Sequence, residues 1–377
     1  MTRKAAFVYD DAMSRHVLSE THPMRPVRLL YTYELAEAYS LFAHECSTLK
    51  APRQATVDEV STFHTPEYIN AVERVGQGDF SIDPMEFNIG PGDNPGYEGM
   101  YDAALLSTGG SMRCVELLLD EGYDAAFNIS GGLHHAMPGY AYGFCVFNDP
   151  VLAINEMLRR GLRVAYVDID CHHGDGVQHA FYDTDRVITI SLHETGQFLF
   201  PGTGYAQETG TGRGRGYSVN VPLYPYTGDE TYYWVFQQVV LPLLDAFRPD
   251  VLVSQLGIDS HYRDPITHLA LTTQGFGKVV SEFSGKAPKW LALGGGGYDL
   301  QAVARSWALA YGIMSEQSLD DEIPKSYRRA YGVGSLPDTE QLPDVVLKAQ
   351  GDAKTFAEAS VGAVQGIIFP THGIRSV

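Results

Sequence analysis

The sequence predicts a three-layer α/β/α fold in which helices cover both faces of a mostly parallel β-sheet. Short apolar stretches rich in valine, isoleucine and aromatic residues alternate along the chain with amphipathic stretches of helical length. Most of the short stretches are uniformly apolar, which is typical of strands buried on both faces of a parallel sheet. Their alternation with helices indicates a layer of helices on each side of the sheet.

The elements can be assigned in chain order. Apolar stretches predict strands at AAFVY (5–9), AAFNIS (125–130), RVAYVDID (163–170), VITISL (187–192), DVLVSQLG (250–257) and KWLALGGGG (289–297). Amphipathic stretches predict helices over 26–39, 97–122, 149–161, 231–247 and 299–314. Beyond about residue 316 the chain is polar and interrupted by prolines, with one further helix expected over 353–369. We therefore expect one domain over residues 1–377, with a core of about 5–315 and a tail of about 316–377 that packs on it.

The composition is that of a soluble globular protein. The 377 residues are 44% apolar and carry a net charge of −19. This charge disfavours direct binding to nucleic acid or to anionic membranes, and it favours a basic partner or a cationic side chain. The four cysteines form no CxxC pair, which fits a reducing compartment. Neither a signal peptide nor a run of about 18 apolar residues occurs, so we expect a cytoplasmic location.

Titratable side chains crowd the end of the third predicted strand, in VDIDCHHGDG (167–176). If the strand continues, Asp168, Asp170 and His172 share one face, because side chains alternate along a strand. Two close carboxylates repel each other unless a cation lies beside them, and aspartate with histidine suits zinc or a similar divalent metal. Alternatively, the segment is a capped turn with Asp175 near the start of a helix. An EF-hand is excluded, because the required glycine and glutamate are missing.

Two further sets of polar residues follow buried strands. His134 and His135 come after the second predicted strand, where they could bind a metal, act as acid and base, or lie in a surface loop. The carboxylates of the first cluster could orient these imidazoles. Asp259 follows the fifth predicted strand, where it either caps a helix or joins Asp170 and His172 as a third metal ligand. Three protein ligands would leave an open position, as a catalytic zinc requires.

Four glycines, Gly294 to Gly297, follow KWLAL and precede Tyr298. A phosphate-binding loop is one interpretation, but the GxGxxG spacing and a following Lys-Ser or Lys-Thr pair are missing. Alternatively, the glycines let the backbone approach another group closely, and Tyr298 projects into the crevice beyond the strand ends. Its hydroxyl would then stabilise a developing oxyanion.

Nine short segments carry a resemblance to a known family by their residues and their order along the chain. They are HPMRPVR (22–28), FHTPEYI (63–69), GGLHHA (131–136), GFCVFND (143–149), VDIDCHHGDGVQ (167–178), SLHETGQFLFPGTG (191–204), GRGYSVNVPL (214–223), QLGIDS (255–260) and LGGGGYD (293–299). Together they resemble the zinc-dependent histone deacetylase family, in its class I branch, and the related prokaryotic acetoin-utilization-type deacetylases. The resemblance covers roughly residues 5 to 315. It implies the arginase-deacetylase fold and hydrolysis of N-ε-acyl-lysine, acetyl by default, in protein or peptide substrates.

The resemblance also implies a role for each clustered residue. One catalytic zinc ion would be held by Asp170, His172 and Asp259. The implied catalytic residues are His134 paired with Asp168, His135 paired with Asp175, and Tyr298 as the residue that polarises the carbonyl. In the family, the second histidine of the pair is the principal general base and acid, while the first gives electrostatic support.

The implied substrate site is a narrow apolar tube. Its walls would include Phe144 and Phe200, with Gly143 giving clearance. Asp93 matches a rim aspartate that holds the substrate backbone, and Arg28 matches an arginine lining an internal cavity for the released acid. The family also binds K⁺ or Na⁺ at structural sites. These match Asp168, Asp170, His172, Ser191 and Leu192 at one site, and Phe181, Thr184, Val187 and Tyr217 at the other.

Three features depart from the family pattern or lack a derived role. Cys171 lies between two implied zinc ligands, so sensitivity to oxidation is a hypothesis. The bulky segment His261 to Arg263 could narrow the rim. We expect His173 to be a buried, hydrogen-bonded support for its loop.

Three other functions compete with this interpretation. A binuclear-manganese ureohydrolase would need an aspartate two positions after Asp259, where this chain has His261. An acetylpolyamine amidohydrolase uses an acidic gatekeeper, and the matching position here is Ile266. A non-catalytic reader of acyl-lysine is disfavoured by the intact set of ligands and catalytic residues. The sequence leaves the acyl group, the protein substrate and the oligomeric state open.

Overall fold

One β-sheet forms the centre of the computed structural model, which describes residues 3–79 and 81–375. Eight described strands lie in the order β2-β1-β3-β8-β7-β4-β5-β6, and every neighbouring pair is parallel. The strands are β1 (Ala5–Val8), β2 (Ser47–Lys50), β3 (Ala125–Asn128), β4 (Val164–Asp168), β5 (Val187–Glu194), β6 (Ser218–Leu223), β7 (Val251–Gln255) and β8 (Lys289–Leu293). All six predicted strands are present among them.

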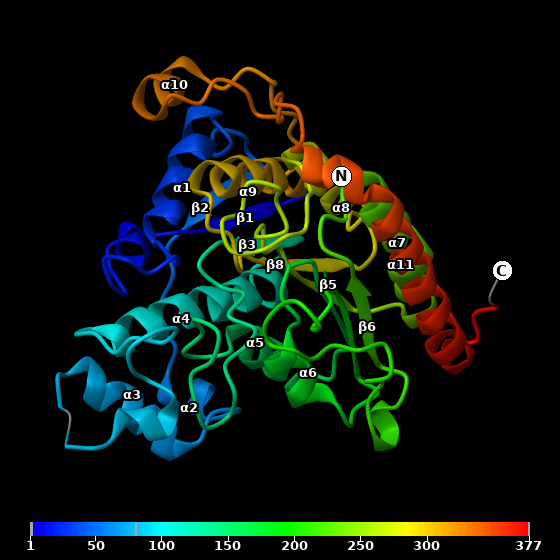
Figure 1. Ribbon diagram of the computed structural model, residues 1–377. Coiled ribbons are helices and arrows are strands. Elements are labelled where there is room, and N and C mark those ends of the chain that lie inside the picture. Colours follow the sequence, from blue (N-terminus) through cyan, green and yellow to red (C-terminus); the bar gives the residue numbers. More distant parts are fainter. Residues whose placement is uncertain (1–2, 80, 376–377) are drawn as a thin grey trace.

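Helices cover both faces of the sheet (Figure 1). On one face, α1 (Val27–Ala38), α7 (Asp229–Phe247), α8 (Thr273–Ser281) and α9 (Leu300–Met314) share a core with strand residues such as Phe7 and Phe127. On the other face, α4 (Met100–Leu119), α5 (Asp149–Arg159) and α6 (Asp175–Phe181) pack against Ala6, Ala126 and Tyr166. Alternate strand residues thus face opposite helical layers, as the pleat requires. The predicted three-layer fold is confirmed.

The sequence analysis missed the two edge strands. Only Ser47 of the four residues of β2 is buried, so this strand lacks a buried apolar run. The strand β6 carries Asn220 and Pro222, and proline is tolerated there because an edge strand needs fewer ladder hydrogen bonds. Short helices were missed as well: α2 (Val57–Val60), α3 (Pro66–Gly76), α8 and α10 (Lys325–Tyr331). Within α8, two glycines weaken the helical signal.

The C-terminal tail lies against the rest of the molecule. Its long helix α11 begins at Asp344 rather than at residue 353 and ends at Ile368. It runs along α7 and β6 (Figure 1), while α10 contacts α1. These contacts support our proposal that the whole chain forms one domain. No helix within the described residues is long and apolar enough to cross a membrane.

Candidate active site

Four adjacent strands at the middle of the sheet end in one row. Asp168, Gln255, Leu293 and Asn128, which end β4, β7, β8 and β3, are paired in register across the sheet. Because all these strands are parallel, the loops that follow them meet at the same edge, where ligands bind in open α/β sheets. The loops carry the polar clusters of the sequence: Asp170 and His172 after β4, Asp259 after β7, Tyr298 after β8, and His134 and His135 after β3.

The structure brings together the three residues expected to bind a metal. One ligand atom each from Asp170, His172 and Asp259 lies within 4.8 Å of the others, and all three residues are buried. His172 Nδ1 is 2.9 Å from Asp259 Oδ2 and 3.2 Å from Asp170 Oδ1. Asp259 begins no helix, so the alternative of a helix cap is wrong for this residue.

Fixed donors orient both carboxylates of this cluster. The side-chain amide of Gln255 and the backbone N–H of Gly296 each donate to Asp170 Oδ2 at 2.8 Å, and the backbone N–H of Cys171 donates to Asp259 Oδ1 at 2.7 Å. The other oxygen of each carboxylate therefore faces His172. This arrangement holds two oxygens and one nitrogen ready for a cation, and such a donor set fits zinc.

The charge of the cluster also favours a cation. Burial opposes protonation of the His172 ring, but the Asp259 charge and hydrogen bonds to both carboxylates raise its pKa well above the ordinary value. Two buried carboxylates with no compensating positive charge would be costly. The site therefore favours a positive charge at this point, which a divalent ion would supply.

The two histidines of GGLHHA each bind a carboxylate, in the pairing expected from the resemblance. His134 Nδ1 is 2.7 Å from Asp168 Oδ2, and His135 Nδ1 is 2.6 Å from Asp175 Oδ1. Their Nε2 atoms lie 3.0 Å apart. Asp175 is the first residue of α6, so it begins a helix and also orients a histidine.

The surroundings of the two histidines shift their pKa values in opposite directions. Burial lowers the pKa of His134, but the charges of Asp168 and Asp170 outweigh it and raise the value to about 9. Burial, with the neighbouring His134 and His172, holds the pKa of His135 well below the ordinary value. These opposite shifts make His135 the neutral ring of the pair near pH 7 and His134 the protonated one.

Contacts of its backbone N–H and of its aromatic ring hold Tyr298 in position. Its N–H donates to Asp264 Oδ2 at 2.9 Å, and its ring lies 5.8 Å from that of Phe144. Burial and the charges of Asp259 and Asp170 raise the pKa of the Tyr298 hydroxyl well above its usual range, so this group stays a donor. Sequence reasoning missed Asp264, although it lies five positions after Asp259 in the same loop.

Aromatic rings surround the histidines. Phe200 lies edge-on to His135, with ring centroids 5.1 Å apart, and Tyr142 lies 4.8 Å from Phe200. Gly143 gives clearance to two of these rings, because a Cβ there would come within 2.5 Å of His135 and 2.9 Å of Phe200. Phe144 has φ 67°, a left-handed conformation that is strained for a phenylalanine and is often found at functional sites. Tyr142 was missed, although it lies two residues from Phe144.

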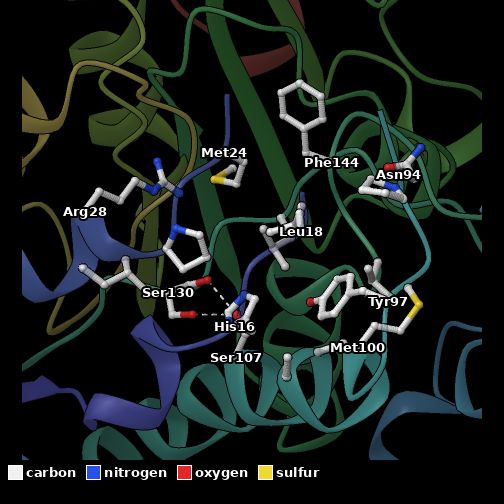
Figure 2. Close-up of a pocket in the computed structure, with 17 residues that line it drawn as sticks. His16, Leu18, Met24, Arg28, Asn94, Tyr97, Met100, Ser107, Ser130 and Phe144 are labelled. Atoms are coloured by element: carbon white, nitrogen blue, oxygen red, sulfur yellow. Dashed lines mark hydrogen bonds between the residues drawn. The ribbon is translucent and has the colours of Figure 1, made fainter. Parts of the chain in front are cut away.

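Arg28 lines a partly open pocket of about 70 Å³ together with Leu133 and Phe144, and Figure 2 shows Arg28 and Phe144 at this pocket. Its guanidinium donates to the carbonyls of Gly295 and Gly297 and lies over the Trp307 ring. Its Nε finds no hydrogen-bond partner among the described residues. The arginine thus keeps one unused donor in a buried position.

The remaining two expected substrate contacts lie near the rim. Asp93 is exposed, and its carbonyl accepts from His22, whose ring packs on Phe144 at 4.6 Å. Ile266 is half-buried and donates its N–H to Asp264, the residue that also binds Tyr298.

The structure places three residues that depart from the family pattern or lacked a derived role. The His261 side chain is fully buried and bonds to Asp338 of the tail, so this residue does not narrow the rim, whereas Tyr262 and Arg263 are more exposed. Cys171 is buried, and burial raises the pKa of its thiol, which disfavours the reactive thiolate. His173 is buried and bonds to Thr203 and Gln178, as expected for a loop support.

Comparisons with known sequences agree with this arrangement. The histone deacetylase domain matches residues 22–314. The chain is 38% identical over 335 residues to the acetoin utilization protein AcuC of Bacillus subtilis, a match that covers 86% of each chain. It is 38% identical to histone deacetylase RPD3 of Saccharomyces cerevisiae, over 88% of this chain and 76% of that protein. It is 37% identical to human histone deacetylase 1, over 85% of this chain and 67% of that protein.

Solved structures give the same result. A crystal structure of an HDAC homolog from Aquifex aeolicus superposes with a TM-score of 0.83 at 30% identity, over 93% of this chain and all of that one. A structure of an HDAC homolog complexed with SAHA superposes with a TM-score of 0.81 at 29% identity, over 94% of this chain and all of that one.

Proposed function

The chain belongs to the histone deacetylase family and has its arginase-deacetylase fold, and from this premise we propose that it is a zinc-dependent lysine deacylase. It would hydrolyse the amide of N-ε-acyl-lysine, acetyl by default, in protein or peptide substrates. The observation that carries the proposal is the contact between two clusters: a buried Asp170, His172 and Asp259 set, and a neutral His135 whose ring lies 5.9 Å from that of His172.

In the proposed mechanism, Asp170, His172 and Asp259 hold one zinc ion. When bound, zinc acts as a Lewis acid that polarises a carbonyl and lowers the pKa of water. His135 accepts the proton of the attacking water and returns a proton to the lysine amine as the C–N bond breaks. Asp175 fixes the tautomer of His135, and the Tyr298 hydroxyl donates to the amide oxygen as its negative charge grows. The products are a carboxylate and a free lysine side chain.

The surroundings of the cluster suit a long, thin substrate arm. Phe144 and Phe200 would pack against the lysine methylenes, and the missing side chain of Gly143 lets the rings of His135 and Phe200 lie close to its backbone. Asp93 would accept hydrogen bonds from the substrate backbone at the exposed rim. Arg28, with its unused Nε donor, would bind the released carboxylate.

Two alternatives use a similar set of residues. A binuclear-manganese ureohydrolase is disfavoured, because His261 is turned away to Asp338 and adds no further ligand oxygen beside Asp259. An acetylpolyamine amidohydrolase is disfavoured by the apolar Ile266 at the gatekeeper position. The test compares turnover of acetyl-lysine peptides with turnover of acetylspermidine and acetylputrescine. We expect the peptides to be preferred, and a preference for the polyamines would overturn the proposed substrate.

Three further expectations belong to this proposal. K⁺ or Na⁺ would bind at the two sites that match the family, one beside Asp168 and Ser191 and one beside Tyr217. The enzyme would act in the cytoplasm. Its acidic net charge would favour substrates whose flanking residues are basic.

A further inference from the structure

The loop of the catalytic histidines is held by side chains to which the proposed mechanism assigns no role. Residues 129–136 lie outside the strands and helices, so their backbone groups need other partners. Asn148 and Asp149, at the start of α5, bind four of these groups, and both residues are fully buried.

Asp149 binds the amino-terminal side of this loop. Its carboxylate accepts from the backbone N–H of Gly132 at 3.0 Å and of Leu133 at 2.9 Å, the two residues that precede His134. The Ser111 hydroxyl donates to the same carboxylate at 2.5 Å. Burial raises the pKa of Asp149 to about 6, so near neutral pH the group is an acceptor with no proton of its own to donate. Hydrogen bonds to an ionised group are about twice as strong as neutral ones.

Asn148 binds the other side of the loop. Its side-chain amide donates to the carbonyls of His134 at 3.2 Å and Ala136 at 2.9 Å. Its own N–H donates to His64 Nε2, and the opposite nitrogen of that ring lies 3.0 Å from the Met137 carbonyl. Successive backbone groups on both sides of His135 are therefore fixed by two neighbouring residues.

The backbone packs closely around these two side chains. A Cβ on Gly131 would come within 2.4 Å of Asp149 Oδ2, and a Cβ on Gly176 would come within 2.6 Å of the Asn148 amide. We propose that Asn148 and Asp149 are positioning residues that set the location of the His134 and His135 rings for proton transfer. This inference rests on the proposed function, because the two residues would position histidines that are catalytic only in the proposed mechanism.

The test is Asp149→Asn, which keeps the shape of the side chain but replaces one carboxylate oxygen by an NH₂ group. Only one acceptor then remains for the N–H groups of Gly132 and Leu133. Since a displacement of about 1 Å in a reacting group can cost about 10²-fold in rate, we expect kcat to fall about 10²-fold. KM should stay within about threefold, and one zinc should remain bound per chain. The matched control is Asp229→Asn, which alters a partly buried carboxylate that accepts a backbone N–H and a hydroxyl, both from Thr272. We expect it to lower Tm similarly while kcat stays within about twofold.

A second variant serves if Asp149→Asn does not fold. Asn148→Asp keeps the helix cap to the Val151 N–H but replaces the amide donor by an acceptor facing two carbonyls. It should lower kcat at constant zinc content as well. The inference is overturned if kcat of the folded variants stays within twofold of wild type, or if Asp229→Asn loses as much. If wild type turns over no acyl-lysine peptide, the proposed function fails instead. Crystal structures of the variants then decide the inference: it requires displaced histidine rings beside an unmoved metal cluster.

Discussion

The two halves of the site are anchored in different ways. Asp170 and His172 follow the end of β4 at Asp168 directly, so a central strand determines where they lie. His135 lies well beyond the end of β3 at Asn128, and side chains of α5 hold its loop. The candidate metal cluster thus lies at the sheet edge, whereas the histidine pair is held by hydrogen bonds to residues later in the chain. We therefore expect mutations in the first half to remove the metal, and mutations in the second half to lower turnover while the metal stays bound.

The largest effect is expected in the half anchored by strands. Asp259→Ala removes one ligand and leaves Asp170 and His172 without their partner, so we expect loss of zinc and of all measurable activity. Metal analysis together with a peptide assay checks this result. Asp245→Ala, which removes an exposed carboxylate paired with Lys286, is the matched control. Full zinc content in Asp259→Ala would contradict the proposed ligand set.

A mutation in the half anchored by the loop should lower the activity of the enzyme without loss of the bound metal. His135→Ala removes the proposed base, and general acid–base catalysis contributes about 10² to 10⁴-fold, so kcat should fall by this factor. Zinc content should remain one per chain. His179→Ala, at an exposed histidine of α6, should leave kcat unchanged. Loss of zinc in His135→Ala would show that the two halves are not independent.

Tyr298→Phe tests the proposed oxyanion donor. Removal of one oxyanion donor costs about 10² to 10³-fold in kcat. We expect this loss with unchanged zinc content and little change in KM. Tyr39→Phe removes a hydroxyl bonded to the carbonyl of Asp320, outside the site, and is the control. Activity like that of wild type in Tyr298→Phe would remove the tyrosine from the mechanism.

The smallest effect on turnover is expected at the tail, which supports the loop after Asp259. Asp338 bonds to His261 and Arg305, and its side chain is 4% exposed. Burial alone would raise the pKa of Asp338, but the hydrogen bond and charge of His261 and the charge of Arg305 hold it well below its ordinary value. Asp338→Asn should lower the free energy of unfolding by about 3 kcal/mol at pH 7, with kcat changed only a few-fold.

The pH dependence of this stabilisation has a definite sign. A group with a lowered pKa in the folded state stabilises the protein above its unfolded pKa of about 3.9 and loses that contribution as pH falls. The difference between wild type and Asp338→Asn should therefore shrink below about pH 4. Urea unfolding at several pH values measures it, with Asp352→Asn on the exposed side of α11 as control. A difference that grows on acidification would contradict the assignment.

Much of the fold could be predicted because the central strands are uniformly apolar. The stretches that became β3, β4, β7 and β8 are buried on both faces, and a buried strand leaves a clear signal. The edge strands β2 and β6 were missed, because an edge position tolerates exposed, polar and proline residues. The start of α11 was missed because its first residues are mostly exposed and follow a proline-rich stretch.

The candidate site was likewise predictable only in part. Alternation along a continued strand predicted that Asp170 and His172 lie together. They do, although β4 ends before them at Asp168, and the resemblance supplied the partners of both histidines. The resemblance includes Asn148 and Asp149 in the segment GFCVFND but gives them no role, and Asn-Asp-Pro at a helix start has an ordinary interpretation as a cap. Their contacts with residues 132–136 arise only from the tertiary fold. Asp338 was hidden for the same reason, since it lies 77 positions from His261.

The central claim is that one zinc ion in the Asp170, His172 and Asp259 cluster supports amide hydrolysis. The most direct measurement is a titration of metal-free protein with zinc, while acetate release from an acetyl-lysine peptide is followed. We predict that activity rises linearly and saturates at one zinc per chain, with one free lysine formed for each acetate. Saturation only at two metal ions per chain, or no acetate release from the zinc-loaded protein, would contradict the claim.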